Sequence, residues 1–424
     1  MPVFTLVSAV IAVVALSGYA NHRLVRLPES IGITLVALLI SVVIVGVGQF
    51  VPQVAAWAHQ VAHGVDFPSL VFHGLLGLLL FAGSLHVDVM GLSRARWVVV
   101  VLATAGVALS TVLIGWGFFY LCPLFGIRLP LLECLLFGAL ISPTDPIAVL
   151  GLLSKARVTP SLLTQITGEA LFNDGTGVVV FVVLLGLAGA GAGRPDTLHI
   201  AALFARQVLG GLGFGLAVGL AGILMLRTVD SPAVEILITL AMATAGYKAA
   251  DVLAVSAPIA TVVMGLMVGS HGRRHSMPAP MRERLFVFWE LTDDLLNLLL
   301  FALVGLQLTA LAGTVREYLL PAAAALPLVL LARYVSVGVP ISLLRPFQRL
   351  EPHLVKLMTW AGLRGALSIA LALSLPPGGG RELIVTATYL IALFSILVQA
   401  TTLEPLARRW TGSVATEPSA ADGP

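Results

Sequence analysis

Runs of roughly 20 apolar residues recur along most of the chain, and short polar stretches separate them. A helix needs about 20 such residues to cross roughly 30 Å of hydrocarbon. The boundary between the eighth and ninth runs is the least distinct, because only Asp251 and its neighbours separate them. The pattern predicts an all-α polytopic membrane protein with about thirteen transmembrane helices, at residues 3–20, 30–48, 69–87, 97–121, 131–152, 162–190, 200–226, 233–252, 254–270, 285–311, 318–344, 354–375 and 383–405.

The composition excludes a soluble globular domain, because 58% of the residues are hydrophobic and only 11% are charged. Sixteen of the 24 Lys and Arg residues fall in loops on one side of the membrane when the helices alternate in direction. By the positive-inside rule that side is the cytoplasm. We therefore expect a multi-pass protein of the cell (inner) membrane, with its N-terminus outside and its C-terminus cytoplasmic. The net charge of +3 reflects this loop bias, so no nucleic-acid partner is expected.

Five charged residues lie well inside predicted helices: Asp145, Glu169, Asp174, Arg333 and Arg364. A charge at the bilayer centre costs about 2.5–3.5 kcal/mol on insertion scales, and more in simulations. We therefore expect these side chains to pair with one another, to face water, or both.

The fifth segment contains the sequence SPTDPIAVLG, which starts at Ser142. Pro143 and Pro146 each remove a backbone donor and disfavour helix at the preceding residue, so the segment should unwind from Ser142 to Asp145. Thr144 and Asp145 would then stand beside free carbonyls, as in the discontinuous helices of secondary transporters. The alternative is that Asp145 only caps the half-helix that follows the break.

The sixth segment contains the sequence GEALFNDGTG, which starts at Gly168. Glu169 and Asn173 are four residues apart and share a helix face, whereas Asp174 is turned away from Glu169. Arg333 lies in the apolar stretch LPLVLLARYVSVGVP and needs a fixed anion. A permanently paired acid cannot exchange its proton freely. One acid should therefore be the partner of Arg333, and a different acid should take up and release the proton.

The twelfth segment contains Arg364 between Gly362 and Gly365, where a second helix could loosen. We expect Arg364 to neutralise helix C-terminal dipoles at such a break, the alternative being that its side chain snorkels to the surface. The fifth and twelfth segments would then occupy matching places in two inverted-topology repeats.

Three further acids, Glu290, Asp293 and Asp294, stand near the start of the tenth predicted segment on the cytoplasmic side. They are expected either to cap that helix or to line an acidic funnel that concentrates cations.

Cysteine chemistry adds little to this picture. Cys122 and Cys134 both fall near the outer face, where two unpaired thiols are favoured over a disulfide. No Cys or His spacing typical of a metal centre is present, and no cofactor is expected. The polar tail at 409–424 should be a short disordered cytoplasmic segment, which leaves residues 1–408 as a single integral membrane unit.

The motifs resemble one family. ISPTDPIAV, followed about 25 residues later by GEALFNDGTGVVVF, is similar to the NhaP-type monovalent cation/proton antiporters of the sodium/hydrogen exchanger family. FWELTDDLLNLLLFALVGLQL and WAGLRGALSIALAL resemble later signature segments, so the resemblance runs from about residue 5 to 408. It implies a homodimer with a mobile core around the helices at 69–190 and 318–405, a dimerisation part from the remaining helices, and two unwound helices that cross.

The resemblance also implies roles for individual residues. Asp174 would bind either the cation or the proton, with Asp145 and Thr144 at the crossing as further Na⁺ ligands and with Asn173 beside them. Glu169 and Arg333 would form a structural ion pair, and Arg364 would compensate charge at a helix break. Many relatives have a serine where this chain has Ala170, so one candidate cation ligand is missing.

The expected activity is exchange of Na⁺ or Li⁺ for H⁺ across the membrane, serving pH homeostasis. With Asn173 in place of a second acid and Glu169 held by an arginine, a single acid turns over, which favours electroneutral one-for-one exchange. K⁺/H⁺ exchange on the same scaffold remains an alternative. A membrane-embedded enzyme is disfavoured because no Ser–His or paired-Asp catalytic spacing accompanies the break, and a passive channel because buried acids would trap a bare ion. No Walker A sequence appears, so transport is expected without ATP.

Overall fold

The computed structural model describes residues 3–51, 53, 66–156, 158–189, 197–273, 279–308, 315–348, 350–351, 353–378 and 380–411. These residues form helices and contain no β-strand. The tail from residue 412, where disorder is expected, lies outside them, whereas residues 409–411 belong to the last helix. The helices, including short 3-10 and π-helical turns labelled η, are α1 (Val3–Ala20), η1 (Asn21–Val25), α2 (Glu29–Gly48), α4 (Phe67–Ser69), η2 (Leu70–Leu75), α5 (Leu76–Leu85), α6 (Val89–Val101), η3 (Leu102–Gly106), α7 (Val107–Leu121), η4 (Cys122–Phe125), α8 (Leu131–Ile141), α9 (Pro146–Lys155), α10 (Pro160–Gly189), α11 (Thr197–Leu226), α12 (Pro232–Ala241), η5 (Met242–Gly246), α13 (Tyr247–Val252), α14 (Ala257–Arg273), α15 (Ala279–Leu306), α17 (Val315–Leu344), α18 (Leu354–Trp360), α19 (Ala366–Leu373), α20 (Arg381–Phe394), η6 (Ser395–Gln399) and α21 (Ala400–Thr411).

Each of the thirteen predicted segments coincides with one helix or with consecutive helical pieces. The uncertain boundary between the eighth and ninth segments is real, because α13 ends at Val252 and α14 begins at Ala257. The fifth and twelfth segments are both broken, into α8 with α9 and α18 with α19. Within the described ranges, eight helical stretches are long and apolar enough to cross a membrane by length and composition, and the halves of the broken helices are shorter.

Two helices begin well before the apolar runs that predicted them. The fourth segment starts at Val89 instead of residue 97, and α15 starts at Ala279 instead of residue 285. Glu290, Asp293 and Asp294 therefore lie in the interior of α15, and the expectation that they open this helix is wrong. The physical reason is that charged residues such as Glu and Arg are good helix formers, so the helix continues beyond its apolar part.

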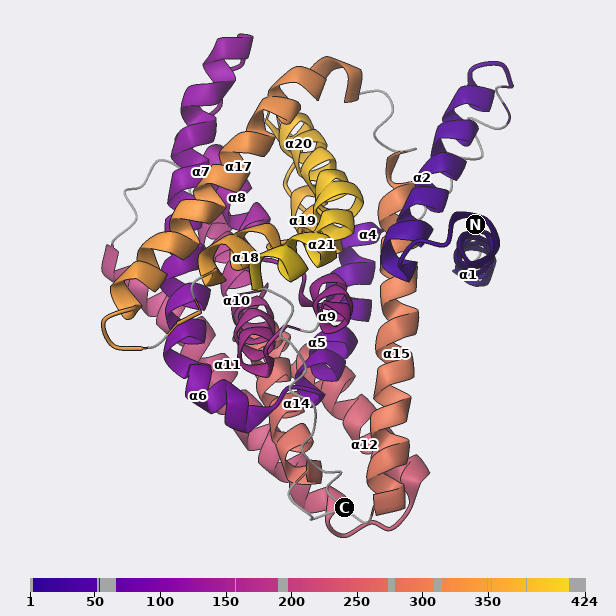
Figure 1. The fold of residues 1–424 in the computed structure, drawn as a ribbon, viewed down its shortest axis with the longest axis vertical. Coiled ribbons are helices and arrows are strands. Elements are labelled where there is room, and N and C mark those ends of the chain that lie inside the picture. The colour runs from indigo at the N-terminus through magenta and orange to yellow at the C-terminus, as the bar shows by residue number, and fades with distance from the viewer. Residues whose placement is uncertain are drawn as a thin grey trace, which may run out of the picture.

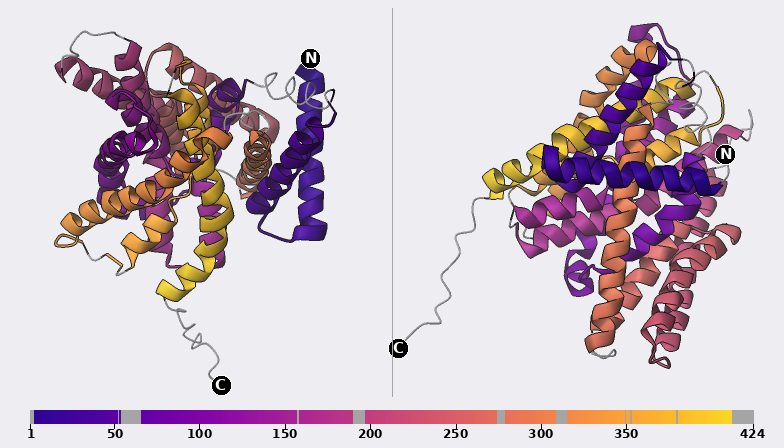
Figure 2. Two further views of the ribbon diagram at one scale, coloured as in Figure 1. Left: turned by 90° about the horizontal axis from the view of Figure 1, so that it is seen from above. Right: turned by 90° about the vertical axis from the view of Figure 1, so that its right-hand side faces the viewer.

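The helices pack in two groups, each with its own buried apolar cluster. One cluster is centred on α7, α8, α17, α19 and α20, and the other on α5, α12 and α14. α15 contributes to both, with Leu300 and Phe301 in the first cluster and Leu285 and Trp289 in the second. Figure 1 shows the broken helices in the middle of the molecule and α15 as a long helix beside them, with α1 and α2 on its other side. In the side view of Figure 2, α1 crosses α15 at a steep angle, and both α1 and α2 contact α15.

Small residues let the helix backbones approach closely, as is typical inside membranes. α7 and α8 meet at Gly115 and Gly138, and a methyl group at Gly138 would lie 2.3 Å from the Thr111 carbonyl oxygen. Ser142, just beyond the end of α8, donates a hydrogen bond of 2.9 Å to Ser110 on α7. This contact anchors the end of α8 at the point where the helix breaks. Cys122 and Cys134, near the same helix pair, are both buried and unpaired, as favoured from the sequence.

Gly138→Ala should destabilise the protein, because the added methyl group would force α7 and α8 apart. Overpacking of this kind costs about 1–3 kcal/mol in soluble cores. The measurement is the melting temperature in detergent, with Gly213→Ala on α11 as the control, since a methyl group there meets no atom within 4 Å. Equal melting temperatures for the two variants would contradict the close α7–α8 contact.

Candidate functional site

The two unwound segments touch each other through their backbones. Residues 143–145 between α8 and α9, and residues 362–365 between α18 and α19, are not helical. The Asp145 amide donates a hydrogen bond of 2.9 Å to the Leu363 carbonyl, so each break satisfies a backbone group of the other. Free backbone groups at membrane depth are tolerated only when they are met in this way.

The C-terminal ends of both first half-helices are met by arginines. Arg364 is buried and donates from Nη1 to the carbonyls of Ser142 and Pro143, at 2.5 and 2.6 Å. It therefore compensates the end of α8, across the crossing, and not the end of its own preceding helix. Arg333 donates from Nη2 to the Met358 carbonyl in the last turn of α18, at 3.4 Å. A positive charge thus stands at each negative helix end.

Asp145 lies at the opposite pair of helix ends. It directly precedes α9, and its Oδ2 would be 2.4 Å from a methyl group placed on Gly365, the residue before α19. The carboxylate is therefore close to the positive N-terminal ends of both second half-helices, which favour an anion. Only a glycine at position 365 leaves room for it. From the sequence, Asp145 was expected to interact only with the start of α9. In the structure its carboxylate also lies beside the start of α19, at the other break.

Glu169 and Arg333 form a buried two-point ion pair. The guanidinium donates from Nη1 to Oε1 and from Nη2 to Oε2, both at 2.9 Å, and both side chains are buried. Asn173 donates to the same Oε1 at 3.2 Å and to the Thr144 hydroxyl at 2.7 Å. One chain of polar contacts therefore runs from Arg333 on α17, through α10, to the break after α8.

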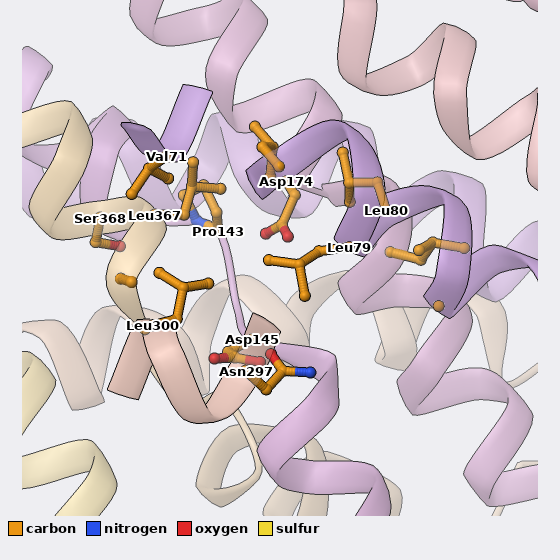
Figure 3. Close-up of a pocket in the computed structure, with 15 residues that line it drawn as sticks. Val71, Leu79, Leu80, Pro143, Asp145, Asp174, Asn297, Leu300, Leu367 and Ser368 are labelled. Atoms are coloured by element: carbon orange, nitrogen blue, oxygen red, sulfur yellow. The ribbon is translucent and has the colours of Figure 1, made fainter. Parts of the chain in front are cut away.

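Asp174 points away from this chain of contacts and into a cavity (Figure 3). Its side chain is buried on α10, and among the described residues no side chain donates a hydrogen bond to its carboxylate. The cavity has a volume of about 60 Å³ and also exposes Asp145, Asn297 on α15 and Ser368 on α19 to its interior. Apolar residues such as Leu79 and Leu300 form the rest of its wall.

The predicted cation-binding residues thus fall into two sets. Asp174 and Asp145 line the cavity together, whereas Thr144 and Asn173 lie outside its lining and bind each other. Ala170 is buried and brings no oxygen to the site. The glycines after Asp174 have a steric role: a methyl group on Gly177 would lie 2.3 Å from the ring of Pro143, so the break can pack against α10 only at a glycine.

The family model described as "Sodium/hydrogen exchanger, transmembrane" matches residues 10–409. This chain belongs to the sodium/hydrogen exchanger family. Members of this family are transporters, which agrees with a site built from two carboxylates and two helix breaks.

Related proteins support the assignment over nearly the full length. The Na⁺/H⁺ antiporter NhaP of Pseudomonas aeruginosa is 43% identical over 412 residues, covering 95% of this chain and 96% of that protein. The Na⁺/H⁺ antiporter NhaH of Halobacillus aidingensis is 30% identical over 408 residues, covering 93% and 95%. The structure of the sodium proton antiporter MjNhaP1 from Methanocaldococcus jannaschii at pH 8 has the same fold, with a TM-score of 0.75 at 19% identity over 97% of this chain and 100% of that one.

Two polar residues of this exchanger's cavity were not singled out from the sequence. Asn297 is the one polar residue in the run LLNLLLF, and Ser368 stands alone in ALSIALAL. An isolated polar side chain in an apolar membrane helix was the signal that would have found both, since such groups face the protein interior.

Replacing Glu169 or Arg333 by Ala should each destabilise the protein strongly, because the remaining partner becomes an uncompensated buried charge. The loss in soluble examples is roughly 3–5 kcal/mol. It is measured as the melting temperature in detergent, and the double variant Glu169→Gln with Arg333→Gln should recover part of the loss.

The matched control for this pair is Glu404→Gln, which removes the exposed Glu404–Arg408 ion pair on α21. Exposed pairs contribute about 0.2–1 kcal/mol, so this variant should melt close to the wild type. If the Glu169 and Arg333 variants melt like this control, the buried pair does not stabilise the fold.

Proposed function

We propose that this protein is a secondary active antiporter that exchanges Na⁺, or Li⁺, for H⁺ by alternating access. The observation that carries the proposal is that, within the described part of the chain, one acid on α10 is ion-paired and another is not. Glu169 is held by Arg333, whereas the Asp174 carboxylate faces a cavity that also contains Asp145. The relatives from Pseudomonas and Halobacillus, which this chain matches over nearly their full length, are Na⁺/H⁺ antiporters.

The chemistry of exchange is competition for Asp174. Hard monovalent cations prefer oxygen ligands, by extension of the preference of Ca²⁺ and Mg²⁺, and the cavity offers the carboxylates of Asp174 and Asp145, the Asn297 amide and the Ser368 hydroxyl. A proton on Asp174 removes the charge that attracts the cation. Cation and proton therefore occupy the site in turn, and each can drive the other across the membrane.

The moving part, in this proposal, is the core formed by the helices at 69–190 and 318–405. The first apolar cluster supports such a division, because most of it lies on α7, α8, α17, α19 and α20 of this core, as does the position of the cavity between α10 and α19 on one side and α15 on the other. At the boundary, α5 of the core packs against α14 outside it, and the two helices share the second apolar cluster. The remaining helices would form the dimerisation part of a homodimer.

We further infer an outside N-terminus and a cytoplasmic C-terminus, in the cell membrane. The basis is the uneven distribution of Lys and Arg between the two sets of loops. In this orientation Glu290 and Asp294, both exposed on α15, stand on the cytoplasmic side of the cavity and attract cations toward it.

Asp174→Asn should fold and insert but abolish exchange, because the carboxylate for which cation and proton compete is then lost. The measurement uses proteoliposomes with an internal pH dye, challenged in turn with Na⁺, Li⁺, K⁺ and choline. Wild-type protein should move protons in response to Na⁺ and Li⁺ and give no response to choline. A response to K⁺ alone would contradict the proposal and would mean that the protein exchanges K⁺ for H⁺.

The matched control is Asp251→Asn, which neutralises an exposed aspartate paired with Lys248. This variant should exchange like the wild type. If Asp174→Asn keeps more than about a tenth of the wild-type rate, the barrier has changed by less than roughly 1.4 kcal/mol. Asp145 or Glu169 would then be the residue that carries the proton.

Exchange should be electroneutral, one cation for one proton, since Asn173 replaces a second acid and Glu169 is paired. The initial rate should then be the same whether the membrane potential is clamped at zero or made inside-negative with K⁺ and valinomycin. A rate that changes with the imposed potential would mean that a second acid takes part.

A further inference from the structure

A second cavity lies on the outer surface of the bundle, away from the crossing. It is bounded by α6 and η3, by α10, and by α11 and α14, and has a volume of about 420 Å³. This volume lies in the range of ligand pockets in proteins. Its wall is mostly apolar, with Val99, Val100, Ala103, Phe172, Leu212 and Ile259 among the residues that form it. We call it the α6 groove. Figure 1 shows α6 at the edge of the molecule opposite α1 and α2.

The α6 groove is polar and positively charged at one place, about one to two helical turns after Val89, the first α6 residue of its lining. Ser93 and Arg96 line it there, and no acidic residue belongs to the lining. The Arg96 side chain is exposed and lies over the ring of Trp97, with 5.8 Å between Cζ and the ring centroid. Within the described part of the chain, Arg96 forms no salt bridge. An anion bound there would therefore meet an arginine that no carboxylate of the described residues neutralises.

The lining of the α6 groove runs along this helix from Val89 to Thr104, and its part beyond Arg96 is about as long as the hydrocarbon of one leaflet. Eight residues separate Arg96 from Thr104, both in the lining, which corresponds to roughly 12 Å along a helix. Half of the hydrocarbon core is about 15 Å thick. Trp97 beside the arginine is typical of the membrane interface, where aromatic rings lie at headgroup level. At the deeper end, the small side chain of Ala103 lies in the π-helical turn η3 and leaves room beside α11.

We propose that the α6 groove binds an anionic phospholipid, with its phosphate on Arg96 and Ser93 and an acyl chain along Val100, Ala103 and Leu212. A cation would be repelled by Arg96, and a wholly apolar molecule would leave the guanidinium without a partner. Basic pockets between transmembrane helices are known to hold anionic headgroups. Because α6 and α10 line one wall and α11 and α14 the other, the bound lipid contacts both the proposed core and the helices outside it.

The test uses the purified full-length protein in detergent, titrated with phosphatidylglycerol or with phosphatidylcholine. Phosphatidylglycerol should raise the melting temperature of the wild type, and native mass spectrometry should show it retained. Arg96→Gln should lose at least half of this shift. Arg94→Gln is the matched control, because Arg94 is exposed two residues earlier on the same helix but does not line the groove. It should keep the shift.

Two results would overturn the proposal. Equal stabilisation by phosphatidylcholine would mean that the phosphate contact is not selective for an anionic lipid, and an equal loss in Arg94→Gln would mean a diffuse effect of surface charge.

A photoreactive phosphatidylglycerol, with a diazirine in one acyl chain, locates the binding site directly. Its crosslinks should map to residues 97–104 and 208–212, and Leu212→Trp should reduce them by filling the groove while phosphatidylglycerol crosslinks elsewhere stay unchanged. Crosslinks that avoid both segments, or a contact between two protein copies there, would exclude a lipid in the α6 groove.

Discussion

The structure depends on one constraint: two helices are broken inside a membrane, and their four new ends must be satisfied without water. The hydrogen bond from Asp145 to Leu363 joins the two breaks, and Arg364 takes up the carbonyls that end α8. Arg333 reaches the end of α18, and Asp145 lies near both N-terminal ends. Each charge stands where the helix dipole favours it, so the crossing forms a nearly self-compensating unit.

The same arrangement determines which acid is available for transport. Arg333 meets the end of α18 and also holds Glu169 through two bonds, and Asn173 adds a third bond to that carboxylate. Glu169 is thereby committed to the fold, and removing either Glu169 or Arg333 would leave its partner as an unpaired buried charge. Asp174 lies on the other side of α10, facing the cavity, where a proton or a cation can compensate its charge. In the proposed mechanism, stability and transport thus depend on neighbouring acids on one helix.

Both cavities lie where helices of the proposed core meet helices outside it, with α10 and α15 at the small cavity and α6 and α11 at the α6 groove. The small cavity contains the carboxylates, and the α6 groove faces outward. A lipid in that groove would touch both sides of a boundary that must shift during alternating access. Occupancy of the groove and movement of the core would then influence each other, because any ligand that binds one arrangement better shifts the population toward it.

The sequence by itself determined the positions of the membrane segments, the two breaks and the five charges inside predicted helices. These depend on local properties, namely the length of apolar runs, the missing N–H of proline and the cost of a charge in hydrocarbon. It also indicated that Arg333 needs an acid, and the quoted motifs indicated Glu169 as its partner. Only the tertiary structure decided that Arg364 serves α8, 222 residues away, and that Asp145 lies beside Gly365. Only the tertiary structure showed that Asp174 and Asp145 line the cavity whereas Thr144 and Asn173 do not. It also showed that Asn297 lines the same cavity. Such contacts depend on how distant helices pack, and no pattern within a single helix specifies which neighbour its polar side chains will meet.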